Sequence, residues 1–169
     1  NIENRIMKIS IVTEGPLGFN GEKYLFSEGG GYYLDRISAY FFDMTILTYA
    51  LRKDSPYYNA VAHYAFKEKN IRIIEYPLAK NSSIWSKVLQ LYRAVIFIYK
   101  QSKNTDLFYI FLPGYTGAVA TIICRLKRKP YCVYLASDWP EEAATLNPIK
   151  SFFGALMLPF YRASVSYLQ

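Results

Sequence analysis

The sequence predicts an α/β fold built on a doubly wound parallel sheet of about six strands, with helices on both faces in three layers. Short apolar, β-branched runs alternate with longer segments of helical periodicity along the chain. Several of these runs are apolar throughout, which is typical of parallel strands that are buried on both faces. With 169 residues, 52% of them hydrophobic, the chain has material for one domain and its core.

The first unit begins with a β-branched run at residues 8–13 (KISIVT), which predicts a buried first strand. The polar, glycine-rich stretch at residues 14–31 is expected to be a long loop, and long loops in compact domains are usually functional or mobile. Residues 32–42 place Tyr and Ile side chains at helical spacing, so a helix is expected there.

The next unit repeats the same order. Residues 44–51 (MTILTYAL) predict the second strand. Ser55 followed by Pro56 is typical of an N-cap and a first helical turn, so a helix is expected to begin there and to end by Asn70. A third strand is expected at residues 71–76, where a proline follows it.

The second half of the chain continues this alternation. A helix is expected where apolar residues keep helical spacing, at Ile84, Val88, Leu91, Val95 and Ile98. The remaining expected elements are a strand at residues 107–112, a helix at 115–126, a strand at 131–135, a helix that begins at Asn147 and Pro148, and a sixth strand at 163–168.

Basic residues outnumber acidic ones by 20 to 13, and part of the excess falls in Arg125, Lys127, Arg128 and Lys129. Such a run can meet anionic lipid head groups, phosphates or nucleic acid. It also suits a solvated helix end, where positive side chains favour the negative end of the helix dipole. We favour the helix-end interpretation, and we expect no nucleic-acid partner.

Cys124 and Cys132 lie in apolar stretches without CxxC spacing, so both are expected to be buried free thiols in a reducing compartment. The single histidine, His63, lies far from them in an expected helix, so it is interpreted as structural or surface and no metal site is expected. No signal peptide and no run of ~18 apolar residues is visible. We therefore expect a cytoplasmic protein, with peripheral contact at the inner membrane face left open.

Ligands of doubly wound sheets bind beyond the carboxyl ends of the strands. Gly29, Gly30 and Gly31 precede the first expected helix, whose free amides would attract phosphate; a flexible hinge is the alternative. Gly114 and Tyr115 follow the strand LFYIFL, where Tyr115 is expected to project into a cleft or, alternatively, both residues only make the turn.

A third such end lies after the strand YCVYL, at Ser137, Asp138 and Trp139. The carboxylate of Asp138 is expected to bind a sugar hydroxyl or to steer a general base. With Glu141, Asp138 also resembles a capping box, which requires no catalysis. Trp139 would stack on a sugar ring or fill the core.

Four stretches of the sequence together resemble the N-terminal domain of GT-B glycosyltransferases, most closely the retaining group 1, or family four, type. They are KISIVTEGP, GGGYYLDRISAYFFDMTILTYAL, DLFYIFLPGYTGAVATIICRLKRKPYCVYLASDW and ASVSYL. The resemblance covers residues 7–169 and is an arrangement of parts rather than one signature. It implies a Rossmann-like domain that binds the acceptor, and a C-terminal domain, absent from this chain, that binds a nucleotide sugar without a metal.

The same resemblance implies that Gly29, Gly30 and Gly31 lie near the donor phosphates and the acceptor. The family often carries a histidine after the fifth strand, near the reacting sugar. Ser137 stands at the matching position here, and Asp138 follows it.

We therefore expect residues 1–169 to form a single Rossmann-like, acceptor-side domain of a glycosyltransferase. The full protein would transfer a sugar from a nucleotide-sugar donor to a glycan or lipid-linked acceptor, with no cofactor, and this domain alone would be inactive. Asp138 is the candidate catalytic residue. The candidate acceptor-binding residues are Gly114, Tyr115, Ser137 and Trp139.

Two other functions stay open. A nucleotide- or NAD-binding regulatory module would require a tight glycine turn after the first strand and an acidic residue after the second, where this chain has Leu51 and Arg52. A non-enzymatic module for membrane surfaces would use the basic run and residues 152–161, although core packing is the favoured role for the latter.

Overall fold

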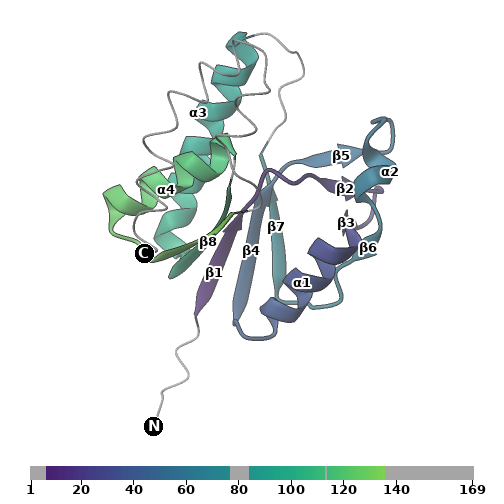
Figure 1. Cartoon of the computed structure of the whole chain (residues 1–169), viewed down its shortest axis with the longest axis horizontal. Helices are drawn as coiled ribbons and strands as arrows, with labels where there is room; N and C mark the ends of the chain where they lie inside the picture. The colour runs from purple at the N-terminus through teal and green to yellow at the C-terminus, as the bar shows by residue number, and fades with distance from the viewer. Residues whose placement is uncertain (1–6, 77–83, 113, 136–169) are drawn as a thin grey trace.

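The computed structural model describes residues 7–76, 84–112 and 114–135, so the helix expected from Asn147 and the strand expected at 163–168 lie outside the described residues. Five parallel strands form the main sheet: β1 (Lys8–Val12), β4 (Asp43–Thr48), β7 (Ile71–Glu75), β8 (Leu107–Leu112) and β9 (Tyr131–Leu135). Their order is β7-β4-β1-β8-β9 (Figure 1). If these five strands are numbered 1 to 5 along the chain, the order is 3-2-1-4-5, which is a doubly wound arrangement. The predicted fold class is confirmed.

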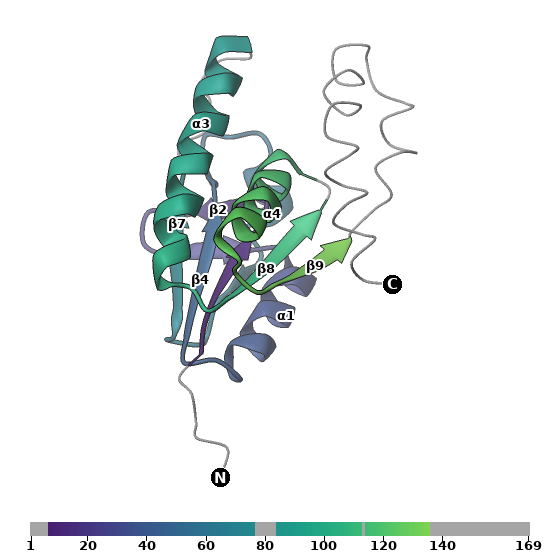
Figure 2. The same ribbon diagram turned by 90° about the vertical axis from the view of Figure 1, so that its left-hand side faces the viewer.

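Helices cover both faces of this sheet. Helix α1 (Glu28–Ser38) lies on one face, and helices α3 (Ile84–Gln101) and α4 (Tyr115–Lys127) lie side by side on the other (Figure 2). Because successive strand residues point to opposite faces, β1 contributes Ile9 and Ile11 to the core under α1, and Val12 to the core under α3 and α4. The result is a three-layer domain with one apolar core on each side of the sheet.

The stretch at residues 14–31 is not the long loop that the sequence predicted. It holds β2 (Leu17–Phe19) and β3 (Tyr24–Phe26), an antiparallel hairpin. This hairpin pairs with β5 (Ala50–Arg52) and β6 (Tyr64–Ala65) in a second, four-stranded sheet of order β5-β2-β3-β6. The prediction failed because these strands are two or three residues long and are stabilised by partners from distant parts of the chain.

The helix expected from Ser55 to Asn70 is also wrong. Only α2 (Tyr58–Val61) forms there, and none of its residues is buried. Tyr64 and Ala65 pair instead with Phe26 and Leu25 of the hairpin, so strand pairing overrides the local N-cap signal. His63 lies between α2 and β6 rather than in a helix, and its side chain is exposed.

Helix α1 begins at Glu28, four residues earlier than predicted, so Gly29, Gly30 and Gly31 lie in its first turn and not in a loop before it. Glycine is a poor helix former, which is why the sequence suggested a loop. A Cβ on Gly31 would lie 2.6 Å from Cδ1 of Tyr64, and one on Gly30 would collide with the ring of Phe26. The two glycines therefore let α1 pack closely against the second sheet.

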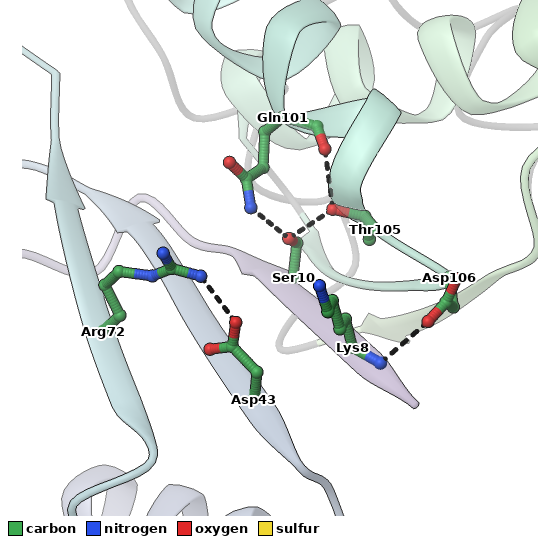
Figure 3. Close-up of polar contacts among 7 residues, drawn as sticks. All are labelled: Lys8, Ser10, Asp43, Arg72, Gln101, Thr105 and Asp106. Carbon is green, nitrogen blue, oxygen red and sulfur yellow. Dashed lines mark hydrogen bonds and ion pairs between the residues drawn. The ribbon is translucent and has the colours of Figure 1, made fainter. Parts of the chain in front are cut away.

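A closed ring of hydrogen bonds joins β1 to the end of α3 (Figure 3). Gln101 Nε2 donates to Ser10 Oγ at 3.3 Å, and Thr105 Oγ1 donates to the carbonyl oxygen of Gln101 at 2.9 Å. Since that carbonyl only accepts, the 2.7 Å bond between Ser10 Oγ and Thr105 Oγ1 has Ser10 as its donor. Ser10 and Thr105 are almost fully buried, so the ring satisfies polar groups inside the core.

Cys124 is buried as predicted, but Cys132 is exposed. In β9, Tyr131 and Val133 pack against the core under α3 and α4, and Cys132 points to the opposite face. Both thiols are free. Among the described helices, none is both long and apolar enough to cross a membrane.

Candidate functional site

The crevice of a doubly wound sheet lies where the strand order reverses, here between β1 and the neighbouring β8. The chain leaves the carboxyl end of β1 toward the second sheet, and it leaves β8 into α4 on the other face. Glu14 follows β1 in this place, and Gly114 is the N-cap residue of α4. The two segments meet at this place, where the strand order reverses, and we call it the switch point of the sheet.

Glu14 caps helix α4 from the segment that follows β1. Its Oε1 accepts a hydrogen bond from the backbone N–H of Thr116 at 2.6 Å and another from Thr116 Oγ1 at 2.9 Å. Gly114 has no side chain to cap the helix itself, so the Glu14 carboxylate, from the segment after β1, takes that role. The negative charge also lies at the positive end of the helix dipole.

The position of the Glu14 carboxylate depends on Gly114. A Cβ at residue 114 would lie 2.7 Å from Cδ of Glu14 and 3.0 Å from its Oε2. Such a contact is closer than carbon atoms tolerate, so a side chain there would push the carboxylate away from Thr116. Glycine at this turn therefore serves the close approach of Glu14 to α4.

Three tyrosines stand around this carboxylate, and we call the cluster of Glu14, Tyr49, Tyr76, Tyr115 and Thr116 the Glu14 site. The Tyr49 and Tyr76 rings, from the ends of β4 and β7, meet edge to face with centroids 6.0 Å apart. Burial raises the pKa of all three tyrosines, and the nearby charge of Glu14 raises them further. Their hydroxyl groups therefore stay protonated and able to donate hydrogen bonds.

Burial also raises the pKa of Glu14, because loss of water disfavours the charged carboxylate. Hydrogen bonds from Thr116 and from the backbone of Tyr115 act in the opposite direction but do not cancel the effect. A carboxylate whose pKa is raised is a stronger base than an ordinary one. The site thus combines a base with several hydroxyl groups, which suits binding and deprotonation of a hydroxyl-bearing ligand.

The structure brings some of the predicted site residues together and separates others. Gly114 and Tyr115 lie at the Glu14 site. Asp138, Ser137 and Trp139 lie outside the described residues.

The three predicted glycines lie in the first turn of α1, which follows the β2–β3 hairpin. The ring of Phe26 lies between these glycines and the Glu14 site. Gly30 packs against one part of this ring, and Gly15, the residue after Glu14, packs against another.

The first turn of α1 has the features of a helix N-terminus that is open to an anion. Its N-cap residue, Ser27, makes no side-chain hydrogen bond to the helix. Gly29 is exposed, and a Cβ there would meet no atom within 4 Å apart from the neighbouring residues and the backbone of α1 itself. The carboxylate of Glu28 lies in the same turn, so an anion would have to approach on the Gly29 side.

Sequence reasoning missed Glu14, the central residue of the site. Its signal was present, since Glu14 is the first charged residue after the first predicted strand, where ligands of this fold bind. The polar, glycine-rich composition of residues 14–31 predicts only a loop around it. Tyr49 and Tyr76 directly follow β4 and β7 in the structure, but the expected strands at residues 44–51 and 71–76 include them, so the sequence did not mark them as residues beyond a strand end.

The described residues contain no group of three or more His, Cys, Asp or Glu side chains that could hold a metal ion. The acidic residue that a dinucleotide-binding module would place after its second strand is replaced by Tyr49, directly after β4. Two strands, β2 and β3, also separate β1 from α1. These features disfavour the NAD-binding alternative.

Searches of protein families and of curated proteins find no match to this chain. Among solved structures, the chain is similar to the C-terminal domain of a hydrogenase from Pyrococcus furiosus. The identity is 14% and the TM-score 0.47, over 76% of this chain and 92% of that one.

Two larger proteins are similar over part of their length. One is described as a UDP-N-acetylglucosamine 2-epimerase from Listeria monocytogenes, with 11% identity and a TM-score of 0.46 over 89% of this chain and 37% of that one. The other is a UGT transferase from Siraitia grosvenorii in complex with UDP, with 12% identity and a TM-score of 0.43 over 76% of this chain and 27% of that one. The chain therefore spans well under half of either protein.

Proposed function

We propose that this chain is the acceptor-side domain of a glycosyltransferase, which moves a sugar from a nucleotide-sugar donor to a hydroxyl group of a glycan or lipid-linked acceptor. The observation that carries the proposal is the Glu14 carboxylate, held at the switch point among tyrosine hydroxyl groups. Hydroxyl-bearing ligands are recognised by this kind of polar and aromatic lining. Sugar rings also stack on aromatic side chains such as Tyr115.

In the proposed reaction, Glu14 removes the proton from the acceptor hydroxyl. The acceptor oxygen then forms a bond to the anomeric carbon of the donor sugar, and the bond from that carbon to the nucleotide phosphate breaks. The proton stays on Glu14, and the nucleoside diphosphate leaves with the electron pair. General-base assistance of this kind contributes about 10²- to 10⁴-fold to a rate.

The donor phosphates would not lie at α4, because Glu14 already occupies the N-terminus of that helix and would repel them. The proposed phosphate contact within this chain is the start of α1, through the amides of Gly29 and Gly30, because the N–H of Gly31 already donates to the carbonyl oxygen of Ser27 at 2.8 Å. A second, donor-binding domain would supply the other contacts. Ser137 and Trp139 are proposed to hold the acceptor, with Asp138 as a second candidate for the base.

The proposal is tested on the full-length protein by calorimetric titration with common nucleotide sugars, followed by a sugar-transfer assay with the donor that binds. We expect Glu14→Gln to lower kcat by about 10²-fold or more and to leave donor affinity unchanged. Glu22→Gln is the matched control, because Glu22 is exposed in the turn between β2 and β3.

The outcomes separate the parts of the proposal. If no common nucleotide sugar binds, the proposed activity is wrong. If transfer is retained in Glu14→Gln and lost in Asp138→Asn, Asp138 is the base and Glu14 only caps α4. If Gly29→Ala weakens donor binding while Glu22→Gln does not, the proposed phosphate contact at α1 is supported.

A further inference from the structure

Helix α3 carries an apolar and aromatic stripe that the domain does not bury. Trp85, Val88, Tyr92, Val95 and Tyr99 recur at alternating spacings of three and four residues, which places them on one side of the helix. All five are exposed, Trp85 to 82% and Tyr92 to 60%. The core face of α3 is a different one and contains Ala94 and Ile98.

Positive charge is concentrated in the same half of the chain. Residues 7–76 contain eight acidic and eight basic side chains and are neutral overall. Residues 84–135 contain eight basic side chains and one acidic one, Asp106. A segregation of this size creates a field of one sign, and it lies on the part of the chain that includes α3 and α4.

The stripe and the charge meet where α3 and α4 end. The two helices lie side by side on the face of the sheet opposite α1 (Figure 2). Lys127 Nζ, from the last turn of α4, donates to Tyr99 Oη at 2.8 Å and lies 4.0 Å from the centroid of its ring. The neighbouring Leu126 is 79% exposed, with Arg125 and Lys127 on either side of it in sequence.

We propose that this surface, made by the outward sides of α3 and α4 and called the α3–α4 face, binds a membrane surface that contains anionic lipids. Helix α3 would lie in the plane of the interface. Trp85 and Tyr92 would sit at the level of the head groups, where amphipathic aromatic rings are favoured. Lys100, Lys103 and Lys127 would contact the anionic head groups.

Two features favour a lipid surface over other occupants. The exposed aliphatic side chains Val88, Val95 and Leu126 gain from removal from water at a lipid interface, whereas a nucleic-acid backbone would contact mainly the basic groups. A second copy of the chain would bring two faces of the same positive charge together, which disfavours self-association. The proposal does not depend on the proposed sugar transfer.

The test uses the full chain and vesicles of two compositions, pure phosphatidylcholine and phosphatidylcholine with roughly one third phosphatidylglycerol, in a co-sedimentation assay. We expect binding to the anionic vesicles that weakens as salt is added. Lys100→Glu and Lys103→Glu should each weaken binding by at least about fivefold, since one basic residue near such a surface contributes about that factor.

The aromatic part of the surface has its own variants. Trp85→Ser with Tyr92→Ser should lower the affinity for anionic vesicles by at least tenfold. The control is Tyr40→Ser with Phe42→Ser, which removes two aromatic rings that are also exposed, Tyr40 to 86%. These rings lie in the turn between α1 and β4, outside the α3–α4 face, so the affinity for anionic vesicles should not change. The far-UV circular dichroism of each variant shows whether it folds. If the double variant of Trp85 and Tyr92 does not fold, the Lys100 and Lys103 variants test the proposal.

A spectroscopic measurement locates the contact. The chain has two tryptophans, so Trp139→Phe leaves Trp85 as the only tryptophan whose emission is followed. We expect a blue shift of its emission on anionic vesicles and quenching by brominated lipid. The proposal is overturned by equal binding to both vesicle types, by undiminished binding of the Trp85 and Tyr92 variant, or by a Trp85-dependent dimer in sedimentation. Trp85-dependent binding to homopolymeric RNA that displaces the vesicles would also overturn it.

Discussion

The Glu14 carboxylate and the first turn of α4 are joined by two hydrogen bonds to Thr116, although the two residues are 102 positions apart in sequence. This contact ties the end of β1 to the helix that follows β8, across the switch point of the sheet. It also holds a carboxylate in a partly buried position. The contribution of Glu14 to the free energy of unfolding depends on pH, so it can be measured without an activity assay.

The stability of Glu14→Gln relative to the natural chain should rise with pH. Because the pKa of Glu14 in the folded protein is raised above its ordinary value of 4.5, the folded state holds the proton more tightly than the unfolded state. The stability that Glu14 contributes is therefore fully present below about pH 4.5 and is lost as pH rises through the raised pKa. Glutamine keeps an oxygen acceptor for Thr116 and does not titrate.

Urea unfolding of both proteins at several pH values between about 4 and 8 measures this difference. Glu22→Gln serves as the exposed control and is measured at the same pH values. A stability difference for Glu14→Gln that is flat across the range, or that falls with pH, would contradict the expected effect of burial.

Two glycine-to-alanine changes should act in opposite directions. At Gly117 in α4, a Cβ would lie 2.5 Å from the carbonyl oxygen of Phe111, a backbone atom that cannot turn away. Gly117→Ala should therefore lower the free energy of unfolding by about 1–3 kcal/mol. Gly29→Ala should raise it by about 0.5 kcal/mol, since Gly29 is helical and its Cβ would meet open space. Equal effects of the two changes, measured by thermal unfolding, would rule out the close packing of α4 on β8.

Removal of the Ser10 hydroxyl should break the ring between β1 and the end of α3 (Figure 3). Ser10→Ala leaves Thr105 Oγ1 without its donor and Gln101 Nε2 without its acceptor in a buried place, and should cost about 1–3 kcal/mol. Ser27→Ala is the comparison, because its hydroxyl makes no capping bond to α1. We expect that change to cost less than about 0.5 kcal/mol in the same denaturant titration. A Ser10 variant as stable as the Ser27 variant would show that the ring contributes little.

The two cysteines should differ in reactivity. Cys132 is exposed on β9, whereas burial raises the pKa of the Cys124 thiol to about 12. At pH 8 the folded protein should release one equivalent of thionitrobenzoate from Ellman's reagent quickly, and the second only after unfolding. Cys132→Ser should remove the fast phase. Fast reaction of both thiols in the folded state would contradict the packing of α4 against the sheet.

The sequence predicted the main sheet well because its strands are apolar enough to be recognised locally. Strands β8 and β9 have the predicted bounds, and β1 and β7 differ from theirs by a single residue. The predicted helices at α3 and α4 also formed, since both keep an apolar face at helical spacing. In each of these elements the local pattern and the tertiary environment favour the same structure.

The second sheet could not be predicted in this way. Strands β2, β3, β5 and β6 are two or three residues long, and β6 exists because Tyr64 and Ala65 meet Phe26 and Leu25 from a distant segment. The same holds for the candidate site. The sequence placed Gly114 and Tyr115 at the end of a strand, but the carboxylate beside them comes from Glu14, and only strand order makes them neighbours.

By itself, the sequence determined the α/β class, the main strands and the edge of the sheet where polar residues gather, because these depend on local periodicity and on hydrophobic runs. Tertiary structure alone decided that Gly29, Gly30 and Gly31 belong to a helix, and that Cys132 faces outward. It also decided that Glu14 caps α4. Each of these features depends on contacts between segments far apart in the chain, and the free energy of such contacts exceeds the weak local preferences that a sequence displays.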